Sequence, residues 1–191
     1  MYLIRHGETD WNRAGKIQGG GYDIALNDNG RRQAEAVAEE LKGLPIGVVA
    51  SSHLKRATET ADIIARKSVT IRSRRKVHEG FGEMRFGEFE GIAHRSPEID
   101  PGLKQRFLSI SKEVASNVDV RFPGGGESTR DVQDRFLVAI KELLEEFDED
   151  HVAVVAHGRT NKVGLAALCQ SIDYDTLKQD SKCYVRYPLL I

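Results

Sequence analysis

The sequence predicts an α/β fold, a three-layer α/β/α sandwich around a mostly parallel central sheet with an antiparallel edge strand. Short apolar segments of strand length alternate along the chain with longer segments whose apolar residues recur at helical spacing. Two of the apolar strands also end in the same dipeptide, His6-Gly7 and His157-Gly158. Ligands of such sheets bind beyond the carboxyl ends of the strands, so we expect a functional site at that edge.

The first two elements are a strand and a helix. Tyr2–Arg5 is a short apolar strand that enters a turn at Gly7. Residues 27–41 form a half-buried helix, because apolar residues recur at i, i+3, i+4 and i+7, namely Ala34, Val37, Ala38 and Leu41. Asn27 suits the N-cap of this helix and Gly43 its C-terminal end.

The middle of the chain continues the alternation. Residues 46–50 are β-branched and apolar, as in a buried strand, and residues 54–67 are helical with one apolar side made of Leu54, Ala57, Ala61 and Ile64. Residues 69–77 contain another strand. Asp100-Pro101 can start a helix that runs to about residue 114 and buries Leu103, Phe107 and Ile110.

The last part contains the longest helix and the clearest strand. Ser128 and Asp131 resemble a capping box, and the helix that they open has an inner face of Val132, Phe136, Ile140, Leu143 and Phe147. Residues 152–156 form a buried strand that leads into a further helix, and residues 183–187 are predicted as the edge strand.

Composition places the chain among ordinary globular proteins. Its 191 residues, 40% hydrophobic and 30% charged, suit one domain over residues 1–191. A net charge of −1 gives no field that attracts nucleic acid or an anionic membrane, so we expect neither partner. Two cysteines, Cys169 and Cys183, cannot build a disulfide framework, and no apolar run reaches membrane-spanning length. Without a recognisable signal peptide, the expected compartment is the cytoplasm.

Four sequence elements carry chemistry. In a parallel sheet, His6 and His157 emerge at the same edge, with their glycines allowing the backbone to turn. Arg56 lies in the first turn of the helix after the buried strand 46–50, where a guanidinium and a helix N-terminus together suit a phosphate. Glu83 lies on a loop punctuated by glycines and is a candidate general acid.

Together these elements resemble the histidine phosphatase superfamily, which includes cofactor-dependent phosphoglycerate mutases and many small-molecule phosphatases. The resemblance extends to about residue 167 and consists of four motifs in the family's order. The first opens with Arg5-His6-Gly7 and the downstream Asn12, followed by Gly15, Gln18, Gly19, Asp23, Leu26, Gly30, Gln33 and Ala34. The others are Ser52, Leu54, Arg56, Ala57, Thr60 and Ala61; Glu83, Gly87, Glu90 and Gly91; and His157-Gly158. The fold that it implies is phosphoglycerate mutase-like.

The resemblance implies a site that works without metal or cofactor. His6 would attack phosphorus as neutral imidazole, its pKa lowered by cationic neighbours, and form a phosphohistidine. Arg5, Arg56 and His157 would hold the phosphoryl oxygens with Asn12 as a further contact, and Glu83 would protonate the leaving alkoxide and later activate water. Further residues that could contact substrate are Gly7, Gln18, Gly19 and Gly158. The remaining histidines are expected in surface or loop positions: His53, His78, His94 and His151.

The sequence also departs from the family pattern. One residue is inserted at Gly19-Gly20-Gly21-Tyr22, and His53, Gly82 and Phe89 replace residues that are common in the family. These differences affect the expected substrate preference more than the expected catalysis. The lid, roughly residues 92–122, would shape the leaving-group pocket, and four of its cations could attract a second phosphate or carboxylate: Arg95, Lys104, Arg106 and Lys112.

Four functions fit the pattern to different degrees. A phosphatase acting on a small phosphorylated metabolite fits best. A phosphoglycerate mutase would need an arginine-rich insertion, and only Arg95 and Arg106 occur between residues 91 and 114, while Glu90 resembles the phosphatase form of the acid loop. An inactive phospholigand-binding scaffold would have lost the nucleophile or the acid, and both are present. A metallohydrolase built on His6, His157 and Glu83 lacks the tight helical ligand spacing of zinc sites.

Overall fold

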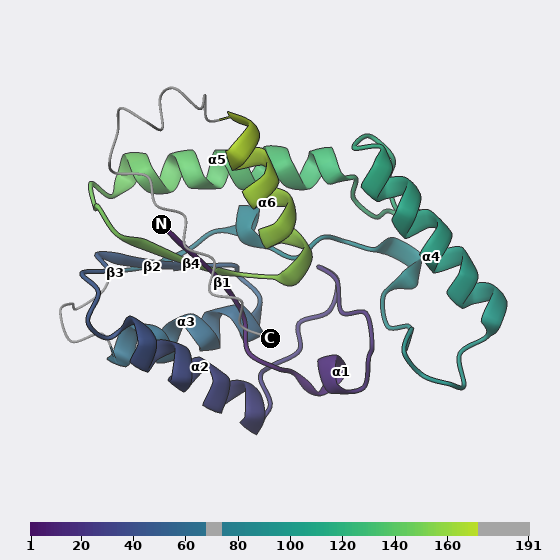
Figure 1. The fold of residues 1–191 in the computed structure, drawn as a ribbon, viewed down its shortest axis with the longest axis horizontal. Coiled ribbons are helices and arrows are strands. Elements are labelled where there is room, and N and C mark those ends of the chain that lie inside the picture. Colours follow the sequence, from purple (N-terminus) through teal and green to yellow (C-terminus); the bar gives the residue numbers. More distant parts are fainter. Residues whose placement is uncertain (68–73, 172–191) are drawn as a thin grey trace.

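The computed structural model describes residues 1–67 and 74–171, and within them a four-stranded parallel sheet forms the middle layer (Figure 1). The strand order is β1 (Tyr2–Arg5), β4 (Val152–Ala156), β2 (Val48–Ser51) and β3 (Arg74–Val77). Arg5 pairs with Ala156, and Ser51 pairs with Val155. The three strands that matter for the site therefore end together at one edge of the sheet.

Helices cover both faces of the sheet (Figure 1). On one face lie α2 (Asp28–Leu41) and α3 (Lys55–Lys67), and on the other lie α5 (Thr129–Glu146) and α6 (Gly158–Ser171). The central strands β2 and β4 are buried along their whole length, as expected of strands covered on both faces.

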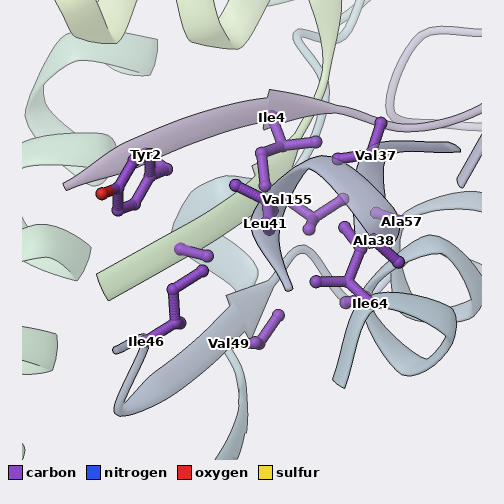
Figure 2. Close-up of a cluster of buried hydrophobic side chains, with 12 residues drawn as sticks. Tyr2, Ile4, Val37, Ala38, Leu41, Ile46, Val49, Ala57, Ile64 and Val155 are labelled. Atoms are coloured by element: carbon purple, nitrogen blue, oxygen red, sulfur yellow. The ribbon is translucent and has the colours of Figure 1, made fainter. Parts of the chain in front are cut away.

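Two apolar clusters fill the space between these layers. Figure 2 shows the cluster under α2 and α3, in which strand residues such as Ile4 and Val155 meet Leu41 and Ile64. Neighbouring strand residues point to the opposite face because side chains alternate along a strand. Leu3 and Val154 accordingly pack with Phe136 and Leu143 of α5 in the second cluster. These clusters hold the strand ends in a fixed position.

A third apolar cluster lies beyond the sheet and joins α4 (Pro101–Ser116) to the acid loop. It contains the aromatic rings of Phe86, Phe89, Phe107 and Phe122. The acid loop is the segment that contains Glu83, and it lies between two short 3₁₀ helices, η1 (Glu79–Phe81) and η2 (Gly87–Phe89). The one-turn helix α1 (Asp10–Arg13) follows β1 on the same side of the molecule as α4 (Figure 1).

The sandwich and the parallel sheet confirm the predicted fold class, with local differences. The strand predicted at 46–50 runs from Val48 to Ser51, the helix predicted from residue 54 begins at Lys55, and α4 continues to Ser116. The edge strand expected at residues 183–187 lies outside the described residues, and all strand pairs within the described part of the chain are parallel. The antiparallel edge is therefore not observed. No helix in residues 1–67 or 74–171 has the length and apolarity needed to cross a membrane.

Candidate active site

The two His-Gly dipeptides lie side by side at the carboxyl ends of β1 and β4. The backbone N–H of His6 donates to the carbonyl of Ala156 at 3.0 Å, which continues the β1–β4 pairing by one residue. The imidazole centroids of His6 and His157 are 5.0 Å apart. Both rings are buried, with 7% and 0% of the residue exposed. The expectation that the two histidines share one edge is confirmed.

Gly7 is required by a close backbone approach. A Cβ atom on Gly7 would lie 2.3 Å from the carbonyl oxygen of Gly30, in the first turn of α2. The Gly7 N–H also donates to Thr60 Oγ1 at 3.1 Å, which ties the turn to α3. The φ angle of Gly7 is not positive, so the turn depends on space rather than on a left-handed backbone. At Gly158, an added Cβ would meet Arg5 Nε at 3.5 Å, an ordinary contact.

The environment of His6 selects one tautomer and the neutral ring. Nδ1 lies 2.6 Å from the carbonyl oxygen of Gly7, and because a carbonyl can only accept, Nδ1 carries the proton and Nε2 keeps its lone pair. Burial, followed by the charges of Arg56 and Arg5, lowers the pKa of His6 to about 3, against the opposing effect of the Gly7 hydrogen bond. The lowered pKa agrees with the expectation, but burial contributes more than the cationic neighbours. A neutral imidazole with a free Nε2 is competent as a nucleophile.

Arg56 is a buried cation whose guanidinium is held by the loop of residues 19–22. Its Nη1 and Nη2 donate to the carbonyls of Tyr22 and Gly19, each at 2.8 Å. Burial lowers the pKa of Arg56, while the nearby carboxylates of Glu83, Asp23 and Glu90 oppose that shift. Within the described structure, Arg56 Nε has no hydrogen-bond partner. A buried, unpaired donor is costly unless a ligand satisfies it, which suits an anion at this point.

The inserted glycine loop is organised by Glu90. Its carboxylate accepts from the N–H of Gly21 at 3.1 Å and from the N–H of Phe86 at 2.9 Å, so it joins the glycine loop to the acid loop. Gly19 has a φ of +57°, and a Cβ there would lie 1.9 Å from Glu90 Oε1. Because Gly19 and Tyr22 hold Arg56, Glu90 contributes indirectly to the position of the guanidinium.

Glu83 faces the start of α6. Its carboxylate oxygen Oε1 accepts from the N–H and the hydroxyl of Thr160, both at 3.1 Å, and from the N–H of Met84 at 3.0 Å. The N–H of Arg159 points to the other oxygen, Oε2, at 3.5 Å. These contacts fix the position of the Glu83 carboxyl group, because the first N–H groups of a helix lack partners in the helix and are free to bind it.

The backbone on either side of Glu83 is held by a buried ion pair. Arg135 on α5 donates from Nη1 to the carbonyls of Gly80 and Gly82, at 2.7 and 2.8 Å, and from Nε to Glu127 Oε1 at 2.9 Å. Glu127 in turn accepts from the backbone N–H of Arg85 at 2.9 Å. The pair therefore fixes the residue before Glu83 and the second residue after it.

Sequence reasoning missed Glu127, Arg135 and Thr160. The predicted capping box is confirmed, since Ser128 and Asp131 exchange side-chain and backbone hydrogen bonds. Glu127 lies next to that cap, and its side chain is only 8% exposed. The sequence carries only a weak signal for the ion pair of Glu127 with Arg135, because the pair forms only when the segment before α5 folds back onto that helix.

A cavity of about 710 Å³ brings most of the predicted site residues together. Those that line it are Arg5, His6, Asn12, Gln18, Gly19, Arg56, Glu83 and Gly158. Asn12 accepts through Oδ1 from the N–H and hydroxyl of Thr9, bonds that do not use its amide nitrogen.

Two predicted site residues do not line the cavity. Gly7 is one, and His157 is the other: its ring is fully buried against His6, and neither of its nitrogens has a hydrogen-bond partner within the described structure. Burial, followed by the neighbouring His6 and Arg56, lowers the pKa of His157 well below its usual value.

The other histidines differ in their surroundings. His53 is exposed, His78 interacts with Glu142, and His151 interacts with the hydroxyl of Tyr2. His94, which was expected to be an ordinary loop residue, lines the cavity. No group of three or more His, Cys, Asp or Glu residues in the described ranges 1–67 and 74–171 is arranged to hold a metal ion.

Comparisons with known proteins agree with this geometry. Residues 1–184 match the family model of the histidine phosphatase superfamily, branch 1. Phosphoglycerate mutase-like protein 4 of Arabidopsis thaliana is 39% identical over 165 residues, which cover 83% of this chain and 66% of that protein. Metal-independent phosphoserine phosphatase of the same plant is 37% identical over 161 residues, which cover 83% of this chain and 63% of that protein. The chain thus spans about two thirds of the length of these relatives.

Solved structures extend the agreement to three dimensions. Mycobacterial glucosyl-3-phosphoglycerate phosphatase, solved with VO₃, superposes with a TM-score of 0.72 at 28% identity over 89% of this chain and 81% of that one. With the family model spanning nearly the whole sequence and the fold shared, the chain belongs to the histidine phosphatase superfamily.

Proposed function

We propose that the chain is a metal-independent phosphatase that hydrolyses small phosphate monoesters through a phosphohistidine on His6. The observation that carries the proposal is the state of the His6 ring: Nδ1 is bound to a carbonyl, Nε2 is free, and burial keeps the ring neutral. His6 lines the same cavity as Arg5, Arg56 and Glu83. The phosphatase names of several relatives support the hydrolytic assignment.

The proposed first half-reaction transfers the phosphoryl group to the protein. His6 Nε2 attacks phosphorus, the bond from phosphorus to the ester oxygen breaks, and the leaving alkoxide takes a proton from Glu83. Arg5 and Arg56 stabilise the charge on the phosphoryl oxygens, which is the main requirement of phosphoryl transfer. We assign Asn12 and His157 the supporting phosphate-binding roles that the family motif implies.

The second half-reaction returns the enzyme to its starting state. A water molecule attacks the phosphohistidine, Glu83 removes a proton from it, and the bond from phosphorus to Nε2 breaks. Inorganic phosphate leaves, and Glu83 is again protonated for the next cycle. No metal or cofactor is required in this scheme, and the proposed partner is a small phosphorylated metabolite in the cytoplasm.

Rapid acid-free quenching tests the intermediate. Wild-type protein mixed with a ³²P-labelled monoester should carry label that is stable in alkali and released in acid, as expected of a phosphohistidine. The His6→Asn variant should carry none, whereas His53→Asn, which changes an exposed histidine, should be labelled like the wild type. Absence of label on the wild type during turnover, or full turnover by His6→Asn, would overturn the proposal.

A phosphoglycerate mutase is a second candidate because several relatives carry the name of a phosphoglycerate mutase or a mutase-like protein. It would use the same phosphohistidine but return the phosphoryl group to a sugar-acid hydroxyl. Following 3-phosphoglycerate with and without 2,3-bisphosphoglycerate separates the two functions: free phosphate supports the phosphatase, and efficient isomerisation with little phosphate supports the mutase. An inactive scaffold would hydrolyse no activated aryl phosphate at any pH.

A further inference from the structure

The cavity is strongly cationic although the protein as a whole is not. Its lining contains six cationic side chains and two carboxylates, Glu8 and Glu83, whereas the chain has a net charge of −1. Two of the cations, Arg5 and Arg56, are assigned to the reacting phosphoryl group in the proposed function. The other four are Lys16, Arg95, Arg159 and Lys162. A neutral leaving group gives these four cations no anionic partner.

Lys16 and Arg95 come from two segments that run side by side at the cavity. Lys16 forms an antiparallel bridge with Ala93, and the N–H of Ile17 donates to the carbonyl of Ile92 at 2.9 Å. Arg95 lies in the turn that follows Ala93 and packs closely against Gly15: a Cβ added to Gly15 would lie 2.6 Å from Arg95 Cβ. This backbone pairing places the two cations on the same wall of the cavity.

Arg159 and Lys162 lie near the start of α6, three residues apart and therefore on one helix face. The Arg159 guanidinium lies 5.9 Å from the centre of the Phe86 ring, which also lines the cavity. None of the four cations forms an ion pair with a carboxylate of residues 1–67 or 74–171. Cations that face a cavity without carboxylate partners are suited to an anionic ligand.

We propose that the preferred substrates carry a second anionic group, a carboxylate or a phosphate, on the leaving alcohol, and that Arg159, Lys162, Arg95 and Lys16 bind it. This inference rests on the proposed phosphatase function and names the substrate class of the same site. The cavity volume of about 710 Å³ accommodates a ligand larger than a phosphate ion.

The lid supplies matched control residues. Of the four lid cations singled out from the sequence, only Arg95 lines the cavity. Arg106 pairs with Glu88 and lies over the ring of Phe89. Lys104 and Lys112 are exposed on α4 and do not line the cavity. Their removal changes the charge of the protein by the same amount without changing the proposed site.

Matched substrates isolate the effect of the second anion. 3-Phosphoglycerate and sn-glycerol 3-phosphate differ mainly in a carboxylate replacing a hydroxymethyl group. Propane-1,3-diol bisphosphate and 3-hydroxypropyl phosphate make the same comparison for a phosphate. In at least one pair, we expect kcat/KM to be higher by about 10-fold or more for the substrate with the second anionic group. This is the effect of one charge-assisted hydrogen bond. The pair with the larger ratio tells which anion is bound.

Variants then assign the preference to the cavity. Arg159→Gln/Lys162→Gln should reduce the ratio of kcat/KM between the two substrates of the preferred pair at least about fivefold, which is a substantial part of one charged contact. Lys16→Gln/Arg95→Gln is a second, independent test of the same ratio. Because both substrates are measured on the same variant, a general loss of activity cancels from the ratio. Lys104→Gln/Lys112→Gln should keep the wild-type ratio.

The outcomes separate the two proposals. A ratio near one for both pairs in the wild type, with p-nitrophenyl phosphate still hydrolysed, would overturn the second-anion site and leave the phosphatase function standing. A wild-type preference that survives in both double variants would also overturn the site. Failure to hydrolyse any monoester, p-nitrophenyl phosphate included, would remove the proposed function and the inference with it.

Discussion

The buried ion pair between Arg135 and Glu127 gives a sharp test of how the proposed general acid is positioned. Arg135→Met keeps an unbranched side chain but removes every hydrogen bond of the guanidinium, including those to the carbonyls of Gly80 and Gly82. It also leaves the Glu127 carboxylate, whose side chain is 8% exposed, without its charge partner. We therefore expect both lower stability and a misplaced Glu83.

The size of the stability effect follows from burial. Removing one partner of a buried ion pair costs about 3–5 kcal/mol. Arg135 keeps 23% side-chain exposure, so we expect the lower end, about 3 kcal/mol. A domain of ordinary stability, about 5–15 kcal/mol, remains folded after such a loss. In Glu127→Gln/Arg135→Met the buried charge is absent, and the double variant should be more stable than the sum of the single effects by about 1–3 kcal/mol.

The catalytic consequence should depend on the leaving group. An alkyl phosphate needs a proton on its departing oxygen, whereas p-nitrophenolate leaves without one. Arg135→Met should therefore lower kcat/KM for an alkyl phosphate by about 10- to 100-fold more than for p-nitrophenyl phosphate, within the usual range for general acid catalysis.

Urea unfolding and steady-state kinetics at one pH check both parts of this prediction. Arg130→Met is a matched control on the same helix, because Arg130 is exposed and pairs with the exposed Asp119, and it should be nearly neutral in both assays. Equal losses of kcat/KM for the alkyl and aryl substrates would show that the ion pair only stabilises the fold. An unfolding free energy unchanged in Arg135→Met would refute the reasoning altogether.

Three further predictions concern individual residues of the site. The pKa of His6 falls from 6.5 in the unfolded chain to about 3 when folded, so the unfolded state binds more protons between these values. Stability is then retained above pH 6.5 and lost as pH falls toward 3; for His6 alone the loss from pH 8 to pH 5 is about 2 kcal/mol. His6→Asn should flatten this dependence in urea titrations, whereas Leu41→Ala, a destabilising core change, should leave the slope intact. Gly19→Ala places a Cβ at a φ of +57° and 1.9 Å from Glu90 Oε1, and should lower the unfolding free energy by about 1–3 kcal/mol. Gly43→Ala, with no atom within 4 Å of its Cβ, is the control, and equal melting curves for the two variants would contradict the steric argument. Arg56→Lys cannot reproduce the fork that reaches Gly19 and Tyr22, and should lower kcat/KM by about 100-fold or more; a loss below about threefold would exclude a role in charge stabilisation.

Periodicity and local motifs were enough to predict the architecture. The apolar stripe of α2, with Ala34, Val37, Ala38 and Leu41, is buried as predicted, and β4 is buried throughout. Such patterns are readable because burial of one helix face or of a covered strand leaves a periodic record in the chain. The two His-Gly dipeptides and Arg56 were likewise placed at one sheet edge by the rule for parallel strands.

The sequence by itself determined the fold class and the shared sheet edge of the two His-Gly dipeptides, because these depend on local patterns and on topology. Its resemblance to the histidine phosphatase superfamily indicated His6 as the candidate nucleophile. Only the tertiary structure decided that His6 keeps Nε2 free, that the His157 ring is buried against His6, and that Glu127 and Arg135 hold the acid loop. It also separated Arg95, which lines the cavity, from Lys104 and Lys112, which do not. The His6 tautomer depends on how the ring meets the carbonyl of the next residue, Gly7. Buried ion pairs and the directions of long cationic side chains depend on contacts between segments far apart in the chain. Neither leaves a periodic trace in the order of residues.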